Sequence, residues 1–160
     1  PSASKPGQTL KDVKDDMFNR IREVFNIGRM KRLEGSTGGY SHNSGTVSGV
    51  LVGVEGGNDA AAKDVSMHVA AMHPLAVVKE EIDPALVASE REILRAAALA
   101  EGKPANIVDK MVEGRLKNFY AEKVLSEQPF VKENSQTVGA YAAEHKMKVK
   151  QFVHWVLGKE

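Results

Sequence analysis

The sequence predicts an α+β fold: a small antiparallel sheet of about three to four strands, packed by helices, with an inserted antiparallel helical hairpin. Three observations predict it. Short apolar segments separated by glycine-rich stretches lie between residues 27 and 54, and a last alternating segment covers 149–157. Apolar residues at helical spacing flank the first group of segments. The charged stretch 80–128 holds two further helical patterns around the turn Gly102-Lys103-Pro104, and helices joined by so short a turn are antiparallel neighbours.

The N-terminal part is expected to contain a leader, a helix and a meander of strands. Residues 1–8 are rich in Pro, Gly and Ser, and we expect them to be disordered. Thr9 and Asp12 form a capping box before an amphipathic helix with the apolar stripe Leu10, Val13, Met17, Ile21 and Val24. Strands are expected at 27–33, 39–42 and 46–54, the last with Val50, Val52 and Val54 on one face.

The remaining elements follow from caps and prolines. A second helix is expected from the cap Asn58 to the stop at Pro74. The hairpin helices begin at Asp83-Pro84 and at Pro104, and their thin apolar stripes predict an exposed hairpin. A short helix capped by Thr137 then precedes the strand at 149–157. The expected organisation is a leader at 1–8, an α+β core at 9–79 and 129–160, and the hairpin at 80–128.

Composition argues against several classes of function. The 160 residues include 22 basic and 21 acidic ones, so the net charge is +1 and no overall field favours a nucleic acid or a membrane as partner. The absence of cysteine excludes disulfides, thiolate nucleophiles, zinc fingers and iron–sulfur clusters. No apolar run has the length of a membrane span. Because the sequence starts without Met or an apolar signal core, we expect it to be part of a longer protein.

The sequence contains no clear motif for catalysis, a metal or a nucleotide. His68 and His73 are five residues apart rather than the four of a helical zinc pair, and we interpret them as partly buried or surface histidines. The glycine-rich stretch 35–57 lacks the Gly-Lys-Ser/Thr of a phosphate-binding loop. Basic residues at 29–32 and 146–150 have no aromatic residues between them, which favours solvated faces over RNA contact. Without a nucleophile, base and orienting group, the sequence argues against an enzyme and predicts no cofactor and no metal.

Several segments nevertheless form a specific pattern. Residues 101–120 read EGKPANIVDKMVEGRLKNFY, and QPFV at 128–131 and TVG at 137–139 follow. Upstream, GYSH at 39–42, GVLV at 49–52 and KDVSMHVAAMHP at 63–74 belong to the same pattern. Along the chain these motifs occur in the same order as in one protein family. From about residue 8 to 157, the chain resembles elongation factor Ts, the exchange factor of bacterial and organellar elongation factor Tu.

The resemblance implies a division of labour. The core resembles the part of the family that docks on elongation factor Tu, and the hairpin resembles its coiled-coil finger. The positions that match contact residues are Ile21, Tyr40, His42, Val131 and Lys132. Three of them also have a structural interpretation: Ile21 lies on a helical stripe and could be core, and Tyr40 and His42 share a strand face and could simply flank the sheet. Val131 and Lys132 follow Pro129 in an expected loop, where exposed apolar residues more often bind partners. The resemblance further implies no direct binding of nucleotide and a bacterial cytoplasmic location, with an organelle as the alternative; a homo-oligomer stays open.

The departures from the family leave three functions open. We find neither the N-terminal three-helix module nor the T-D-F-V loop, and no Asp-Phe pair occurs in the sequence. The family's C-terminal helical module also has no counterpart. We therefore expect either a fragment of the factor or a shortened relative. The first function is part of a guanine-nucleotide exchange factor that promotes GDP release from elongation factor Tu. The alternatives are an exchange-deficient relative acting as an interaction scaffold, and an RNA- or ribosome-binding module.

Overall fold

The computed structural model describes residues 2, 4–24 and 26–159, which form two compact units, Pro1–Arg32 and Leu33–Glu160. The helices are α1 (Leu10–Ile21), α2 (Asp59–Met72), the short 3-10 helix η1 (Lys79–Glu81), α3 (Pro84–Ala100), α4 (Ala105–Lys123) and α5 (Val138–Glu144). The strands are β1 (Thr37–Ser44), β2 (Thr46–Gly56), β3 (Pro129–Phe130), β4 (Glu133–Thr137) and β5 (Met147–Val156). The α+β fold with a small antiparallel sheet is therefore confirmed.

Unit 1 contains the predicted helix α1 with its predicted capping box. The Thr9 side chain accepts a hydrogen bond from the Asp12 backbone N–H, and the Asp12 carboxylate accepts one from the Thr9 N–H at 2.8 Å. The helix ends at Ile21, earlier than the expected Val24, because Arg22 adopts a left-handed conformation with φ of 61°. The disorder expected for residues 1–8 falls partly on residues 1 and 3, which lie outside the described residues.

The strand expected at 27–33 is wrong. The described residues 26–34 form neither helix nor strand, and Ile27 and Met30 are 59% and 70% exposed. The physical reason is the spacing of the apolar residues 27, 30 and 33, which recur at every third position. Because side chains alternate between the two faces of a strand, these residues would be divided between both faces. The chain joins the sheet only at Ser36, whose carbonyl accepts the Val54 N–H at 2.9 Å.

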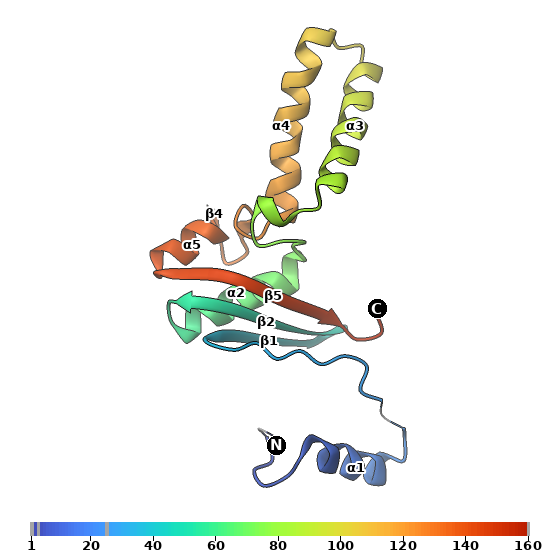
Figure 1. The fold of residues 1–160 in the computed structure, drawn as a ribbon, viewed down its shortest axis with the longest axis vertical. Helices are drawn as coiled ribbons and strands as arrows, with labels where there is room; N and C mark the ends of the chain where they lie inside the picture. Colours follow the sequence, from blue (N-terminus) through green and yellow to red (C-terminus); the bar gives the residue numbers. More distant parts are fainter. Residues whose placement is uncertain (1, 3, 25, 160) are drawn as a thin grey trace. The chain divides into compact units, whose positions relative to one another are not determined.

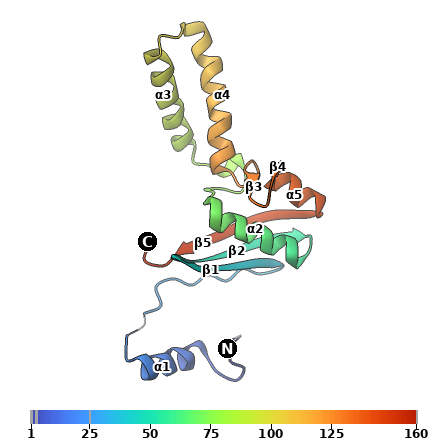
Figure 2. The ribbon, with the colours of Figure 1, turned by 180° about the vertical axis from the view of Figure 1, so that it is seen from behind.

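The central sheet of unit 2 has the order β1-β2-β5, with both pairs antiparallel. On β2, Val50 and Val52 are buried while Leu51 between them is exposed, as alternation predicts. Helix α2 lies across this buried face (Figure 2). The main core cluster combines residues of β2, α2, β3, α5 and β5 with Leu125, which follows α4. Its members are Val50, Val52, Ala61, Ala62, Val65, Val69, Leu125, Phe130, Val138, Ala142 and Met147.

Helices α3 and α4 form the predicted hairpin, lying side by side in both views (Figures 1 and 2). Asp83 caps α3 ahead of Pro84, as predicted. The seam between the helices buries Ala98, Val108, Val112 and Leu116. Ion pairs join the two helices along the hairpin: Arg91 with Glu113, Arg95 with Asp109 at 2.7 Å, and Arg115 with Glu101 at 2.8 Å.

The base of the hairpin is joined to the core by backbone hydrogen bonds. The Leu75 N–H donates to the Lys123 carbonyl at 2.8 Å, and the Leu125 N–H donates to the Ala76 carbonyl at 2.9 Å. Ala76, Ile82 and Val124 form a small buried cluster beside them. The two-stranded ladder of β3 and β4 follows, which the sequence did not predict. Thr137 then caps α5 as expected, accepting the Ala140 N–H at 3.2 Å.

Candidate functional site

Tyr40 and His42 lie side by side on β1, as the period of a strand predicts. Both are partly buried, the Tyr40 hydroxyl is 3.3 Å from His42 Nδ1, and the ring centroids are 6.1 Å apart. His42 Nε2 lies 3.1 Å from the Ser44 carbonyl oxygen, which can only accept. The hydrogen bonds therefore place the proton on Nε2 and leave Nδ1 to accept from the tyrosine. This pairing holds both rings in fixed positions.

Val131 and Lys132 lie in the turn between β3 and β4, next to α2. Val131 is 40% exposed, whereas its neighbour Phe130 is 1% exposed and stacks on Tyr141 with ring centroids 4.2 Å apart. Lys132 Nζ pairs with Asp64 Oδ1 at 2.6 Å, and the Tyr141 hydroxyl donates to the other oxygen of that carboxylate at 3.2 Å. The backbone is thus fixed on the core while the Val131 side chain remains accessible.

His68 is the residue of this region that sequence reasoning missed. The sequence predicts a partly buried or surface histidine here, but the exposed fraction of His68 is 0%. Its Nδ1 accepts the Val131 backbone N–H at 3.1 Å, and its Nε2 lies 2.9 Å from Gln128 Oε1. Burial lowers the pKa of the His68 imidazole, and the hydrogen bond to Gln128 only partly offsets this. The available signal was the position of His68 on the apolar stripe of α2, one turn after Asp64.

Two pairs of the predicted residues are therefore brought together, Tyr40 with His42 and Val131 with Lys132. Ile21 belongs to unit 1, where it ends α1 and is 54% exposed. The structure adds Asp64 and His68 as the residues that hold the second pair.

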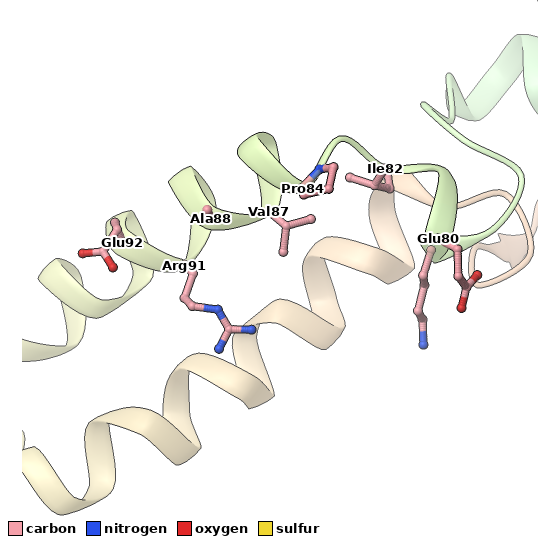
Figure 3. A pocket seen from close by; sticks show the side chains of 8 residues that line it. Glu80, Ile82, Pro84, Val87, Ala88, Arg91 and Glu92 are labelled. Atoms are coloured by element: carbon pink, nitrogen blue, oxygen red, sulfur yellow. The ribbon is translucent and has the colours of Figure 1, made fainter.

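An open groove of about 460 Å³ lies along the start of α3 (Figure 3), lined by Lys79, Glu80, Ile82, Pro84, Val87, Ala88, Arg91 and Glu92. Figure 3 shows Val87 and Arg91 pointing from α3 towards α4. Arg91 pairs with Glu113, and Lys79 lies 3.3 Å from Glu127. Both cations thus have carboxylate partners, so the groove is poorly suited to bind a phosphate.

The described residues include no group of three or more histidine, cysteine, aspartate or glutamate side chains that could hold a metal ion. Within the described part of the chain, no helix is long and apolar enough to cross a bilayer.

The fold and the candidate site define a class: an α+β core with an inserted helical hairpin, in which hydrogen bonds and an ion pair hold Tyr40, His42 and the Val131–Lys132 turn in place. The family model described as Elongation factor TS matches residues 2–159. The chain therefore belongs to the elongation factor Ts family.

Individual relatives agree with this assignment. The chain is 43% identical to elongation factor Ts of Deinococcus radiodurans over 153 residues and 43% identical to that of Deinococcus deserti over 156. It is 41% identical to elongation factor Ts of Methylococcus capsulatus over 158 residues. The matches cover 95–97% of this chain but 57%, 58% and 53% of the three relatives, so the chain spans a little over half the length of the curated relatives it matches.

Proposed function

We propose that this chain is the part of a guanine-nucleotide exchange factor that docks on elongation factor Tu during translation elongation. The observation that carries the proposal is the fixed, accessible Val131–Lys132 turn, in a chain that matches the elongation factor Ts family over residues 2–159. The relatives are bacterial, which supports a role in the bacterial cytoplasm. The chain then acts as a binding protein for a GTPase and not as an enzyme.

An exchange factor works through differential binding. It must bind the nucleotide-free GTPase more tightly than the nucleotide-bound form, and by linkage it then weakens the binding of nucleotide. Contacts that are equal in both states contribute affinity only. Contacts that disturb the phosphates or their magnesium ion contribute exchange. The resemblance to the family implies that task for the Asp-Phe pair of the T-D-F-V loop, and no such pair occurs in this sequence. We therefore assign docking to these 160 residues and expect little exchange from them alone.

Calorimetry tests the docking function. The 160-residue chain should bind nucleotide-free elongation factor Tu and should bind neither GDP nor GTP. Measurable binding of a nucleotide to the chain alone, or no binding to the GTPase, would contradict the proposal. Release of a fluorescent GDP from elongation factor Tu, followed by stopped flow, separates exchange from the scaffold alternative. Release as fast as with a complete factor would show that the driving contacts lie within this chain.

The RNA-binding alternative has weaker support. Lys150 on β5 pairs with Glu55 on β2 at 3.2 Å, so part of the basic run at 146–150 is already compensated. Phosphate contacts would make RNA binding fall steeply with salt concentration, and a titration at two salt concentrations measures this.

A further inference from the structure

We infer that His68 is a positioning residue for docking: its imidazole fixes the backbone of the Val131–Lys132 turn, and so presents that turn to a partner GTPase. The effect on docking rests on the proposed function, whereas the hydrogen bonds by which His68 holds the turn do not depend on it. His68 does not touch a partner in this scheme, since it is fully buried beneath the turn.

The hydrogen bonds around His68 allow one arrangement of its proton. The Val131 backbone N–H can only donate, so the Nδ1 atom that faces it at 3.1 Å must be an unprotonated acceptor. The ring proton therefore lies on Nε2 and is donated to Gln128 Oε1 at 2.9 Å. The Gln128 amide nitrogen then donates to the carbonyls of Glu122 at 2.7 Å and Met72 at 3.3 Å. One chain of hydrogen bonds thus joins the last turns of α2 and α4 to the Val131 backbone.

A second contact from the same helix fixes the next residue. Asp64 lies four residues before His68, and side chains at this spacing lie above one another on a helix. The Asp64 carboxylate holds Lys132 Nζ at 2.6 Å while His68 holds the Val131 N–H. Phe130 is buried beside them, with its ring centroid 5.8 Å from that of His68. The turn is therefore ordered before any partner arrives, which reduces the entropy lost on binding.

The two ring nitrogens have separate tasks, and substitutions can separate them. Asn places a side-chain oxygen close to the position of Nδ1 and keeps an acceptor for the Val131 N–H. Gln reaches the position of Nε2 and keeps a donor for Gln128, but provides no acceptor at the Nδ1 position. If His68 were only a core side chain, Gln, which is closer to His in volume, would be tolerated at least as well as Asn. If it positions the turn, His68→Asn retains docking and His68→Gln loses it.

The first measurement needs no partner. Amide hydrogen exchange at Val131 should be about tenfold faster in His68→Gln than in the wild-type chain, and close to wild type in His68→Asn. In the wild-type chain, ¹⁵N resonances should identify the tautomer of His68 with the proton on Nε2. A proton on Nδ1, or unchanged Val131 protection in His68→Gln, overturns the inference. The tautomer measurement applies even if a variant does not fold.

The second measurement uses elongation factor Tu. Per folded molecule, the dissociation constant should rise about tenfold in His68→Gln and by less than about threefold in His68→Asn. Equal affinities in the two variants would overturn the inference. Failure of the wild-type chain to bind the GTPase would instead overturn the proposed function. The amide hydrogen exchange and tautomer measurements would still decide whether His68 holds the turn.

Discussion

Replacing Gly38 by Ala should strongly destabilise unit 2, because this glycine is where α2 comes closest to the sheet. Gly38 lies on β1 opposite Val52, on the face that α2 covers. A Cβ atom built on Gly38 would lie 2.8 Å from Ala62 Cβ and closer still to the Ala62 carbonyl group. Its φ lies outside the left-handed region, so the effect of the substitution is one of packing and not of backbone strain.

The size of the effect follows from the overlap. Two carbon atoms are at optimal separation at about 3.5–4.0 Å, so the Ala62 carbonyl carbon, which lies even closer to the added Cβ, would have to retreat by about 1.1 Å. The obstacle is helix backbone, which cannot rotate away as a flexible side chain can. Overpacking of this kind typically costs about 1–3 kcal/mol, and a backbone obstacle places Gly38→Ala near about 3 kcal/mol. With a urea dependence of about 2 kcal/mol/M, the unfolding midpoint should fall by about 1.5 M.

Gly39→Ala is the matched control, measured by urea unfolding followed with circular dichroism. Gly39 is the next residue of the same strand and faces the opposite side of the sheet, where an added Cβ would meet Leu51 Cδ2 at an ordinary 3.5 Å. Ala in place of Gly favours a strand by about 0.5–1 kcal/mol, so this midpoint should stay level or rise slightly. Equal midpoints for the two variants would refute the close packing of α2 on β1.

Three further predictions concern the hairpin, the partner surface and acid. Replacing residues 90–116 with a Gly/Ser linker that spans about 8–10 Å should leave the core folded, because Ala76, Ile82 and Val124 remain together; loss of a cooperative thermal transition would contradict this. His42→Ala should weaken binding to elongation factor Tu by about 2 kcal/mol and lower stability by only about 0.5 kcal/mol, as measured by dissociation constant and urea midpoint; the reverse order would make His42 structural. Burial lowers the pKa of both His68 and His154 from 6.5, and the neighbouring His73 adds to the effect at His154. The unfolded chain then binds more protons than the folded one, so the free energy of unfolding should fall as the pH drops below about 6.5; a flat series of urea midpoints between pH 7.5 and 5.5 would contradict this.

The helices could be predicted because their signals are local. The Thr9 capping box, the Asp83-Pro84 start and the Thr137 cap all lie where the structure has a helix N-terminus. The strand expected at 27–33 was wrong because its apolar spacing does not fit either face of a strand. The ladder of β3 and β4 was missed because β4 is short and polar and shows no apolar alternation. The residue of this ladder that packs in the core is Phe130, on β3.

The candidate site could be predicted only in part. The proximity of Tyr40 and His42 could be predicted, because residues two positions apart on a strand lie on the same face. The bond between His68 and Val131 does not, because 63 residues separate them and no local pattern indicates which segment covers α2. The sequence predicts His68 only as a partly buried or surface histidine, and only the fold shows that it is fully buried with a backbone N–H facing its Nδ1.

Helix α2 connects the stability of the fold to the geometry of the proposed docking turn. Its small residues, such as Ala62, allow close approach to the sheet at Gly38, and Val65 and Val69 fill the core beside them. Asp64 and His68 lie on a neighbouring line of the same helix and hold the Val131–Lys132 turn. Because one rigid helix carries both sets of contacts, a shift at Gly38 should also move the two groups that order the turn. A Gly38→Ala chain that still folds at low temperature should therefore show faster amide exchange at Val131, even though the substitution itself contacts neither Asp64 nor His68.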